Sequence, residues 1–290
     1  MAAEGVTEKR LILRGVFAGA VAGLLAFAFA RVFAEPQIQQ AINYESARDS
    51  AQAVLDKAAG IATPAAGPDI FSRTIQADVG IGVGMILFGV AMGALFAVAY
   101  AICLGRIGRL RPRSLALLVA AGGFLGFYLV PFLKYPANPP SIGHEGTIRA
   151  RSELYVLMVV CSLVFLLGAV WLGRRLSARL GNWNAALLAG AAFVLAIGVV
   201  MLILPPLGHL GYNRATFGAF ATETPQPLRN AQGTIVFPGF PADVLFSFRL
   251  YSVGAQLILW SAIGLIFAPM ADRLLTPARA VRSDGALVRA

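Results

Sequence analysis

Four carboxylates stand at the ends of long apolar runs, where they could attract ions at a membrane surface. Glu35 follows the first run, Asp78 and Glu153 precede later runs, and Asp243 precedes the last one. Acids at helix N-termini are favoured by the helix macrodipole, which explains three of the four without any function. The alternative is an acidic vestibule that concentrates divalent cations before they enter a membrane protein.

A proline-rich stretch at residues 129–140 interrupts a long apolar run. Pro131 lacks an amide donor and clashes with the carbonyl four residues back, which frees the carbonyl of Phe127 inside a predicted membrane helix. Such groups are tolerated in a bilayer only where protein or a water-filled cavity covers them. The stretch therefore marks either a helix stop at the lipid surface or the mouth of a cavity, where Asn138 and freed carbonyls would offer oxygen ligands.

Histidine and cysteine are scarce, which limits any metal site. His144 and His209 are the two histidines, and with Glu145 they could form one site in the outer loops. The chain alone cannot build a tight transition-metal cage. No nucleophile elbow, phosphate-binding loop, HExxH or CxxC occurs, and no carboxylate lies in the middle of a predicted span. The sequence therefore predicts neither an enzyme nor a bound cofactor.

The composition places these residues in an integral membrane protein. The chain is 58% hydrophobic and 13% charged, whereas soluble domains carry about 25% charged residues. Its apolar runs predict an all-α bundle of six transmembrane helices in a single membrane domain, residues 1–290. The predicted helices are 11–34, 79–104, 114–133, 154–173, 185–204 and 250–270, with outer loops at 35–78, 134–153 and 205–249.

The first predicted helix carries two further patterns. Gly15, Gly19 and Gly23 form a ridge of small residues along which another helix can approach closely. That helix belongs either to this chain or to a separate subunit. Arg14 and Arg31 lie near opposite faces of the hydrocarbon, where they act as membrane anchors or, alternatively, as charges along a pathway. A cleaved signal peptide is disfavoured, because the run is too long and Arg14 interrupts its start.

Two of the outer loops carry patterns of their own. In 35–78, apolar residues repeat with a helical period up to Gly60 and predict a short amphipathic helix, followed by a proline- and glycine-rich linker at 61–71. The loop 205–249 is rich in aromatic residues and predicts a lid on the outer surface.

The distribution of charge predicts the topology. Six helices place both termini on the same side as the turns after the second and fourth helices. By the positive-inside rule both termini are therefore cytoplasmic, and the net charge of +10 reflects topology rather than nucleic-acid binding. Most acids, including Glu45 and Asp49, fall on the outer side. The basic residues of the two turns are Arg106, Arg109, Arg111, Arg113, Arg174, Arg175 and Arg179.

Four segments resemble a known family. They are LRGVFAGAVAGLLAFAFARVFAEPQIQQAI, YLVPFLKYPANPPSIG, RRLSARLGNWNAALLAG and FPADVLFSFRLYSVGAQLILWSAIGLIFA. They resemble the CbtA family, the probable cobalt transporter subunit of bacteria, from Leu11 to about Ala268. The proline-rich stretch and the first helix are the most specific parts. The family is often described with five spans, one fewer than predicted here.

The resemblance implies a subunit of the bacterial inner membrane for cobalt uptake that feeds cobalamin synthesis. It also implies a small single-helix partner, CbtB, whose histidine-rich end is thought to meet the metal. We therefore expect a subunit of a divalent metal-ion transporter with cobalt as substrate. The alternative is a non-transporting scaffold or accessory subunit of a larger membrane complex.

Overall fold

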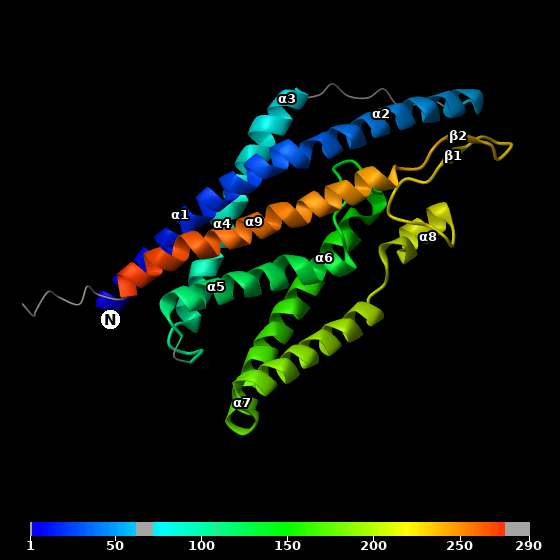
Figure 1. The fold of residues 1–290 in the computed structure, drawn as a ribbon. Coiled ribbons are helices and arrows are strands. Elements are labelled where there is room, and N and C mark those ends of the chain that lie inside the picture. Colours follow the sequence, from blue (N-terminus) through cyan, green and yellow to red (C-terminus); the bar gives the residue numbers. More distant parts are fainter. Residues whose placement is uncertain (1, 62–71, 109, 276–290) are drawn as a thin grey trace, which may run out of the picture. The chain divides into compact units, whose positions relative to one another are not determined.

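The structure is a computed structural model that describes residues 2–61, 72–108 and 110–275 (Figure 1). Long helices dominate it, which confirms the predicted helical class. Most of the predicted linker at 61–71, Arg109 and the basic tail after Leu275 lie outside the described residues. The elements are α1 (Ala2–Phe33), α2 (Glu35–Ala58), α3 (Arg73–Ile75), η1 (Gln76–Gly80), α4 (Ile81–Cys103), α5 (Pro112–Gly123), η2 (Phe124–Leu129), α6 (Val130–Lys134), η3 (Glu145–Thr147), α7 (Ile148–Ile203), η4 (Leu207–His209), α8 (Gly211–Phe217), β1 (Leu228–Arg229), β2 (Ile235–Phe237) and α9 (Ala242–Leu275).

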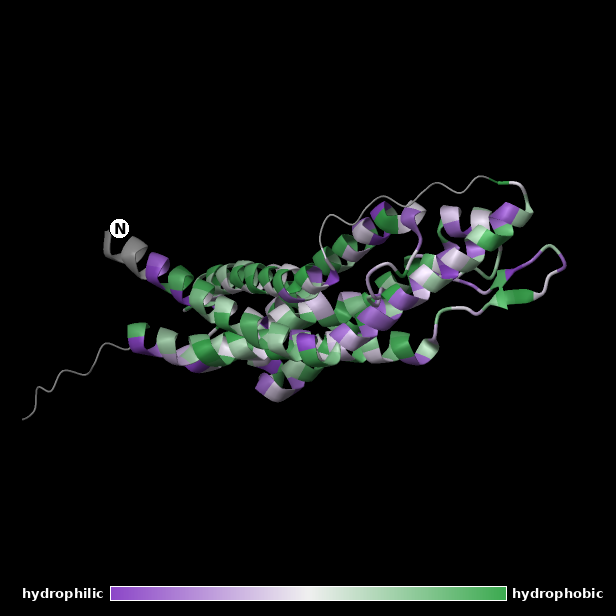
Figure 2. Ribbon diagram, turned by 90° about the horizontal axis from the view of Figure 1, so that it is seen from above, coloured by the Kyte–Doolittle hydropathy of each residue, from purple (hydrophilic) through white to green (hydrophobic). Residues whose placement is uncertain are grey.

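Five helical segments in the described part of the chain are long and apolar enough to cross a membrane. Their mean hydropathy lies between 1.8 and 2.9, and green, apolar residues dominate most of the long helices (Figure 2). The sequence predicts six spans, and the difference arises within α7. The five segments are Glu8–Phe33, Arg73–Cys103, Pro112–Lys134, Glu145–Phe217 and Ala242–Leu275.

The long helix α7 contains both helices predicted at 154–173 and 185–204. Gly181 has non-helical backbone angles (φ 72°, ψ 165°), and the chain folds back there into two arms (Figure 1). Glycine adopts a positive φ without the steric cost of a Cβ, so one residue suffices for the turn. The arms pack on each other, since a Cβ built at Gly173 would lie 3.4 Å from that of Ala189.

The third candidate span changes its helical form along its length. The π-helix η2 lies between α5 and α6, and Pro131 at the start of α6 is fully buried. Pro131 cannot donate to the carbonyl of Phe127. The Tyr155 hydroxyl of α7 donates to that carbonyl instead, at 3.3 Å. The carbonyl expected to be free is thus covered by protein, as the interior of a bilayer requires.

The chain divides into two compact units. The first comprises Met1–Ala28, Thr74–Gly123 and Ala255–Ala290, and the second comprises Phe29–Arg73 and Phe124–Gly254. The prediction of a single membrane domain stays a prediction.

Within the first unit, the glycine ridge of α1 packs against α4. A Cβ added at Gly15, Gly19 or Gly23 would lie closer than 3.0 Å to the backbone of α4, a separation that real side chains do not adopt. This face of α1 is therefore occupied by a helix of the same chain. Near its start, Arg14 donates a hydrogen bond to the backbone carbonyl of Met270 in α9.

Within the second unit, aromatic contacts hold the long loop after α7 in place. Tyr44 of α2 and Ile142 of the proline-rich loop belong to one buried cluster, against which Phe237 and Phe240 pack. These two rings lie 5.4 and 5.1 Å from the ring of Tyr44. Phe237 belongs to a small antiparallel hairpin, β1 with β2. The loop therefore lies on α2 and on the proline-rich segment.

Candidate functional site

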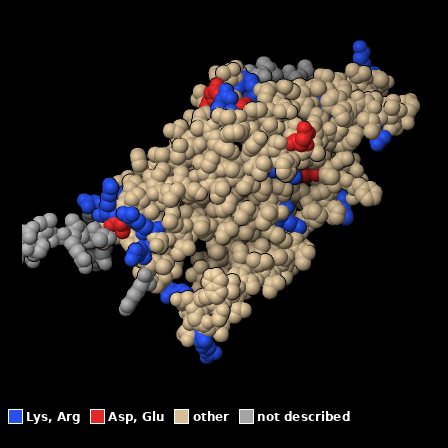
Figure 3. All heavy atoms as spheres, viewed as in Figure 1, with Lys and Arg blue, Asp and Glu red and all other residues tan. Residues whose placement is uncertain are grey.

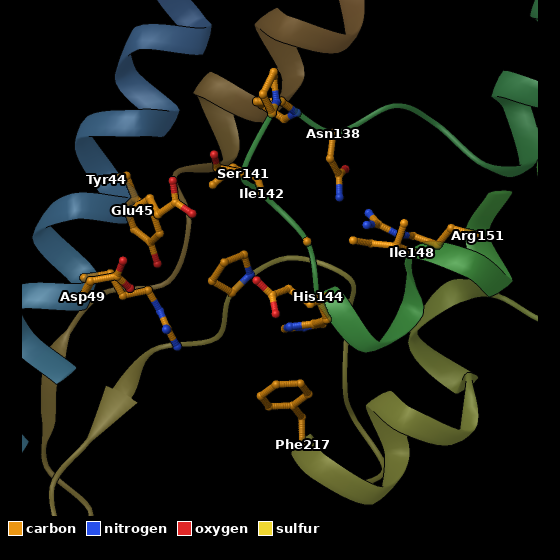
Figure 4. A pocket seen from close by; sticks show the side chains of 16 residues that line it. Tyr44, Glu45, Asp49, Asn138, Ser141, Ile142, His144, Ile148, Arg151 and Phe217 are labelled. Atoms are coloured by element: carbon orange, nitrogen blue, oxygen red, sulfur yellow. The ribbon is translucent and has the colours of Figure 1, made fainter. Parts of the chain in front are cut away.

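A pocket of about 610 Å³ lies within the second unit (Figure 4). Its wall is formed by α2, residues 138–145, the start of α7, Phe217 at the end of α8, and Pro225 in the loop that follows α8. Carboxylate, guanidinium, imidazole and amide groups line it. The side chains on which its chemistry depends are Tyr44, Glu45, Arg48, Asp49, Asn138, Ser141, His144, Glu145, Arg151 and Phe217.

Two backbone positions bend residues 138–145 around this pocket. Ser141 has φ 67° and Gly143 has φ 150°, values in the region that favours glycine. A Cβ at Gly143 would lie 2.5 Å from Nη1 of Arg151. The missing side chain therefore leaves room for the Arg151 guanidinium in the wall of the pocket.

Three carboxylates line the pocket close to one another. Glu45 and Asp49 lie one turn apart on α2, and Glu145 begins η3. Burial raises the pKa of the Glu45 carboxyl above its ordinary value of 4.5, a hydrogen bond with Ser141 opposes the shift, and the charges of Asp49 and Glu145 add to it. No ion pair is described for these three within residues 2–61, 72–108 and 110–275. A cation in the pocket would relieve their mutual repulsion.

His144 lies beside these carboxylates, and its ring has a fixed orientation in which one nitrogen could bind a metal ion. Its ring stacks on Phe217, with centroids 4.1 Å apart and planes inclined by 26°. Its Nε2 lies 3.2 Å from the carbonyl oxygen of Thr222. Because a carbonyl only accepts, this contact requires a proton on Nε2, and in the neutral ring the lone pair is then on Nδ1. Histidines that bind metals commonly donate their other nitrogen in this way.

Glu223, only 7% exposed, holds the wall of the pocket behind His144. Its carboxylate accepts hydrogen bonds from Oγ1 of Thr147 at 2.5 Å and Nδ2 of Asn213 at 2.7 Å. It also accepts the amide N–H of His144 at 3.2 Å and pairs with Arg151, whose Nε lies at 3.2 Å. One buried charge thus ties the loop after α7 to η3 and to the start of α7.

A second pocket of about 410 Å³ shares Asn138 and Arg151 with the first and extends to Tyr155. Arg249 of α9 donates to the carbonyl of Ala137 at 3.1 Å and to Oδ1 of Asn138 at 2.9 Å. The amide oxygen of Asn138 is therefore already an acceptor for a guanidinium. A cation at this oxygen would compete with Arg249, so the ligand role of Asn138 stays a prediction.

None of the four predicted rim carboxylates lines this pocket, and three of them lie elsewhere in the second unit. Glu35 is buried and forms an ion pair with Arg73. Glu153 is exposed and pairs with Arg149 one turn earlier, at 2.7 Å. Asp243 is exposed in the first turn of α9. The structure does not gather these three carboxylates at the pocket. Their part in a cation path stays a prediction.

The remaining predicted residues are divided between other positions. Asp78 lies in η1 of the first unit, and His209 is exposed in η4 and does not line the pocket. Of the three predicted metal residues, the pocket includes His144 and Glu145. Among the described residues, no three His, Cys, Asp or Glu side chains gather closely enough to hold a metal ion. A metal-binding role of the three stays a prediction.

Sequence reasoning did not single out Glu45, Asp49 or Glu223 as site residues. A signal existed for the first two, because carboxylates four apart on a helix share one face. The sequence gives no such signal for the contacts of Glu223. Its partners Thr147 and Arg151 lie far from it in the chain, and only the fold brings them together.

Five candidate spans and their high hydropathy define a multi-pass helical membrane protein with a polar pocket beside its proline-rich loop. A family model described as probable cobalt transporter subunit (CbtA) matches residues 8–272. The chain therefore belongs to the CbtA family, which confirms the resemblance found in the sequence. Comparisons with curated proteins and with solved structures gave no match.

Proposed function

We propose that the chain is the membrane subunit of an uptake transporter for divalent metal ions, with cobalt as the transported substrate. The pocket collects the ion before it enters the membrane. The observation that carries the proposal is the group Glu45, Asp49 and Glu145, three carboxylates that line one pocket. Family membership supports the substrate, because the family is described as probable cobalt transporter subunits.

The pocket suits a hydrated cation better than a tightly bound one. Its carboxylates raise the local concentration of cations through their field, which needs no direct bond to the metal. Arg48 also lines the pocket and opposes this field, whereas Arg151 is paired with Glu223. Weak, rapid capture is what conduction requires, since an ion must leave as readily as it enters.

The inward path would lead from this pocket to the second one and on to the break at Pro131. Tyr155 lines the second pocket and also binds the carbonyl of Phe127. The hydroxyl and the carbonyl supply oxygen atoms where the helix is interrupted. Arg151, which lines both pockets, would have to stay with Glu223 while a cation passes.

The proposal includes six spans, cytoplasmic termini, the bacterial inner membrane and a role in supplying cobalt for cobalamin synthesis. The two arms of α7 count as two of the spans. A small single-helix partner of the CbtB type supports transport by bringing histidine ligands, because this chain has only two histidines. Such a partner fits the description of the family as transporter subunits.

Cobalt uptake tests the proposal. Cells that lack their own cobalt transporters would express the chain with the single-helix partner, the partner alone, or the chain alone, and accumulation of radioactive cobalt would be measured. We expect uptake to require the chain. Equal uptake by cells with the partner alone would refute the proposal.

A scaffold without transport activity is the second candidate. The exposed apolar surface of α7 favours it, because Leu202 and Ile203 are 86% and 75% exposed and could contact other membrane subunits. A scaffold would purify within a large assembly, and neutral variants of the pocket carboxylates would leave cobalt uptake by that assembly unchanged.

A further inference from the structure

The turn between the two arms of α7 carries a compact basic cluster. Arg174, Arg175 and Arg179 are all exposed there, and the chain contains no acidic residue between Glu153 and Glu223. Figure 3 shows basic side chains at the tip of α7, at the lower end of the view, with no acidic atoms on that tip. The cluster therefore presents uncompensated positive charge.

Two exposed tryptophans flank these arginines. Trp171 is 63% exposed and Trp183 is 76% exposed, whereas Trp260 is 3% exposed. The guanidinium of Arg175 lies over the ring of Trp171, 5.8 Å from its centroid. Tryptophan is enriched at the boundary between membrane and water, where its ring meets lipid headgroups. The aromatic rings place the basic cluster at that depth.

The exposure of the two arms of α7 independently supports a position of the turn at the boundary between membrane and water. Only 11% of the most apolar window in this segment is buried within the structure. Most residues of this window are therefore at least partly exposed, as expected of side chains that face lipid. A turn that joins two such arms lies where the hydrocarbon ends and the phosphate groups begin.

The other basic turn is different, because two of its arginines already have acceptors within the chain. Arg113 pairs with Asp272 at 2.7 Å, and Arg106 donates to the carbonyl of Ile102 at 2.8 Å. In the described part of the chain, no carboxylate pairs with any arginine of the α7 turn. Among the described residues, the α7 turn thus combines guanidinium groups that have no carboxylate partner with tryptophan rings.

We propose that the α7 turn is a binding site for the headgroup of an anionic phospholipid. Guanidinium groups bind phosphate oxygens through paired, charge-assisted hydrogen bonds, and the flanking indoles contact the glycerol region of the same lipid. The site is separate from the cation pocket, and it does not depend on the proposed transport activity. Its occupant is a lipid of the surrounding membrane rather than a soluble phosphate or a partner protein.

Energy transfer from tryptophan to a labelled lipid tests this assignment directly. The full chain with Trp260→Phe retains Trp171 and Trp183 as donors, both at the site. It would be titrated in neutral detergent micelles with dansyl-labelled phosphatidylglycerol and, separately, with dansyl-labelled phosphatidylcholine. We expect tighter binding of the anionic lipid. Each basic residue near an anionic surface favours binding about fivefold.

Charge-matched variants separate the site from the net charge of the protein. The triple variant Arg174→Gln/Arg175→Gln/Arg179→Gln should weaken phosphatidylglycerol binding at least fivefold and leave phosphatidylcholine binding unchanged. The control Arg149→Gln/Arg214→Gln/Arg229→Gln also removes three exposed positive charges, all of them outside the turn, and should retain the preference. The single variant Arg175→Gln provides a milder form if the triple variant folds poorly.

Three results would overturn the proposal. The first is equal binding of the two lipids by the parent chain. The second is an equal loss of preference in the control and in the turn variants, which would indicate net charge alone. The third is complete displacement of the labelled lipid by soluble glycerol phosphate at the same concentration, which would indicate a site for free phosphate.

Discussion

Replacing Glu223 by glutamine should loosen the pocket wall by about 2–3 kcal/mol. Removing one partner of a fully buried ion pair costs about 3–5 kcal/mol, and the side chain of Arg151 is 26% exposed, so part of that cost is relieved by water. Thr147 and Asn213 donate to different oxygens of the carboxylate, so glutamine would keep an acceptor oxygen for one of them and turn its –NH2 group, itself a donor, toward the other. A hydrogen bond to a charged acceptor is worth about 1.5–3 kcal/mol. In Glu223→Gln only part of this free energy is lost for each bond.

Amide hydrogen exchange on the full chain in detergent measures this local loosening. The protected amide of His144, which donates to Glu223, should exchange faster by roughly 30–150-fold, the factor that 2–3 kcal/mol represents. The exposed pair Arg149–Glu153 is the control. Because exposed ion pairs contribute about 0–1 kcal/mol, Glu153→Gln should leave the exchange of His144 nearly unchanged.

A double-mutant cycle with Arg151→Met tests the reasoning more strictly. If the two side chains stabilise the loop as a pair, the double variant should lose at least about 1 kcal/mol less than the sum of the single variants. Additive losses would refute the coupling between Glu223 and Arg151. Unchanged exchange at His144 in Glu223→Gln would refute the role of Glu223 as the hub.

Three further predictions concern the spans and the pocket. Gly19→Ala should destabilise the protein by about 1–3 kcal/mol in thermal unfolding, because its Cβ meets the backbone of α4, whereas Gly84→Ala, with open space around it, should be neutral or stabilising by up to about 1 kcal/mol. Tyr155→Phe should cost about 1 kcal/mol in the same assay, since it removes the donor to Phe127. Cobalt uptake should fall as the external pH is lowered through the raised pKa of Glu45, because protonation removes the negative charge of this carboxylate. Glu45→Gln should abolish this part of the pH profile. An unchanged pH profile in the variant would contradict the role of Glu45.

The same shift has a consequence for stability. A carboxyl whose pKa is higher in the folded protein than in the unfolded chain binds its proton more tightly when folded. Its contribution to stability is therefore present at low pH and is lost as the pH rises through the raised pKa of Glu45. At neutral pH, Glu45→Gln should leave the unfolding temperature unchanged or raise it.

The spans were predictable because each depends on local composition. Apolar runs of sufficient length identify every candidate span. Because Pro131 has no amide N–H, the sequence also predicts that the carbonyl of Phe127 needs another hydrogen-bond donor. The sequence also predicted a turn between the helices 154–173 and 185–204, in the basic stretch that contains Gly181, but it did not indicate that helical structure continues up to this one glycine from both sides. The sequence therefore indicates two helices, whereas the structure joins them in one segment.

The candidate site was less predictable, because its parts come from distant segments. His144 and Glu145 stand out by residue type and do line the pocket. The rim prediction included Glu35, but Glu35 pairs with Arg73, an interaction that depends on how the chain folds after α2. Charge and position along the chain predict which acidic residues belong to the outer loops, and only the fold determines which of them share a cavity.

The most direct test of the proposed function compares two aspartates on the same helix. Asp49 lines the pocket, and Asp56, two turns further along α2, does not. Initial rates of cobalt uptake would be measured for Asp49→Asn and Asp56→Asn, each expressed with the single-helix partner. We predict at least a fivefold lower rate at low cobalt for Asp49→Asn, since one unit charge near a cation is worth about 1 kcal/mol even in water, and a normal rate for Asp56→Asn. Equal rates for the two variants would show that the pocket does not collect the ion.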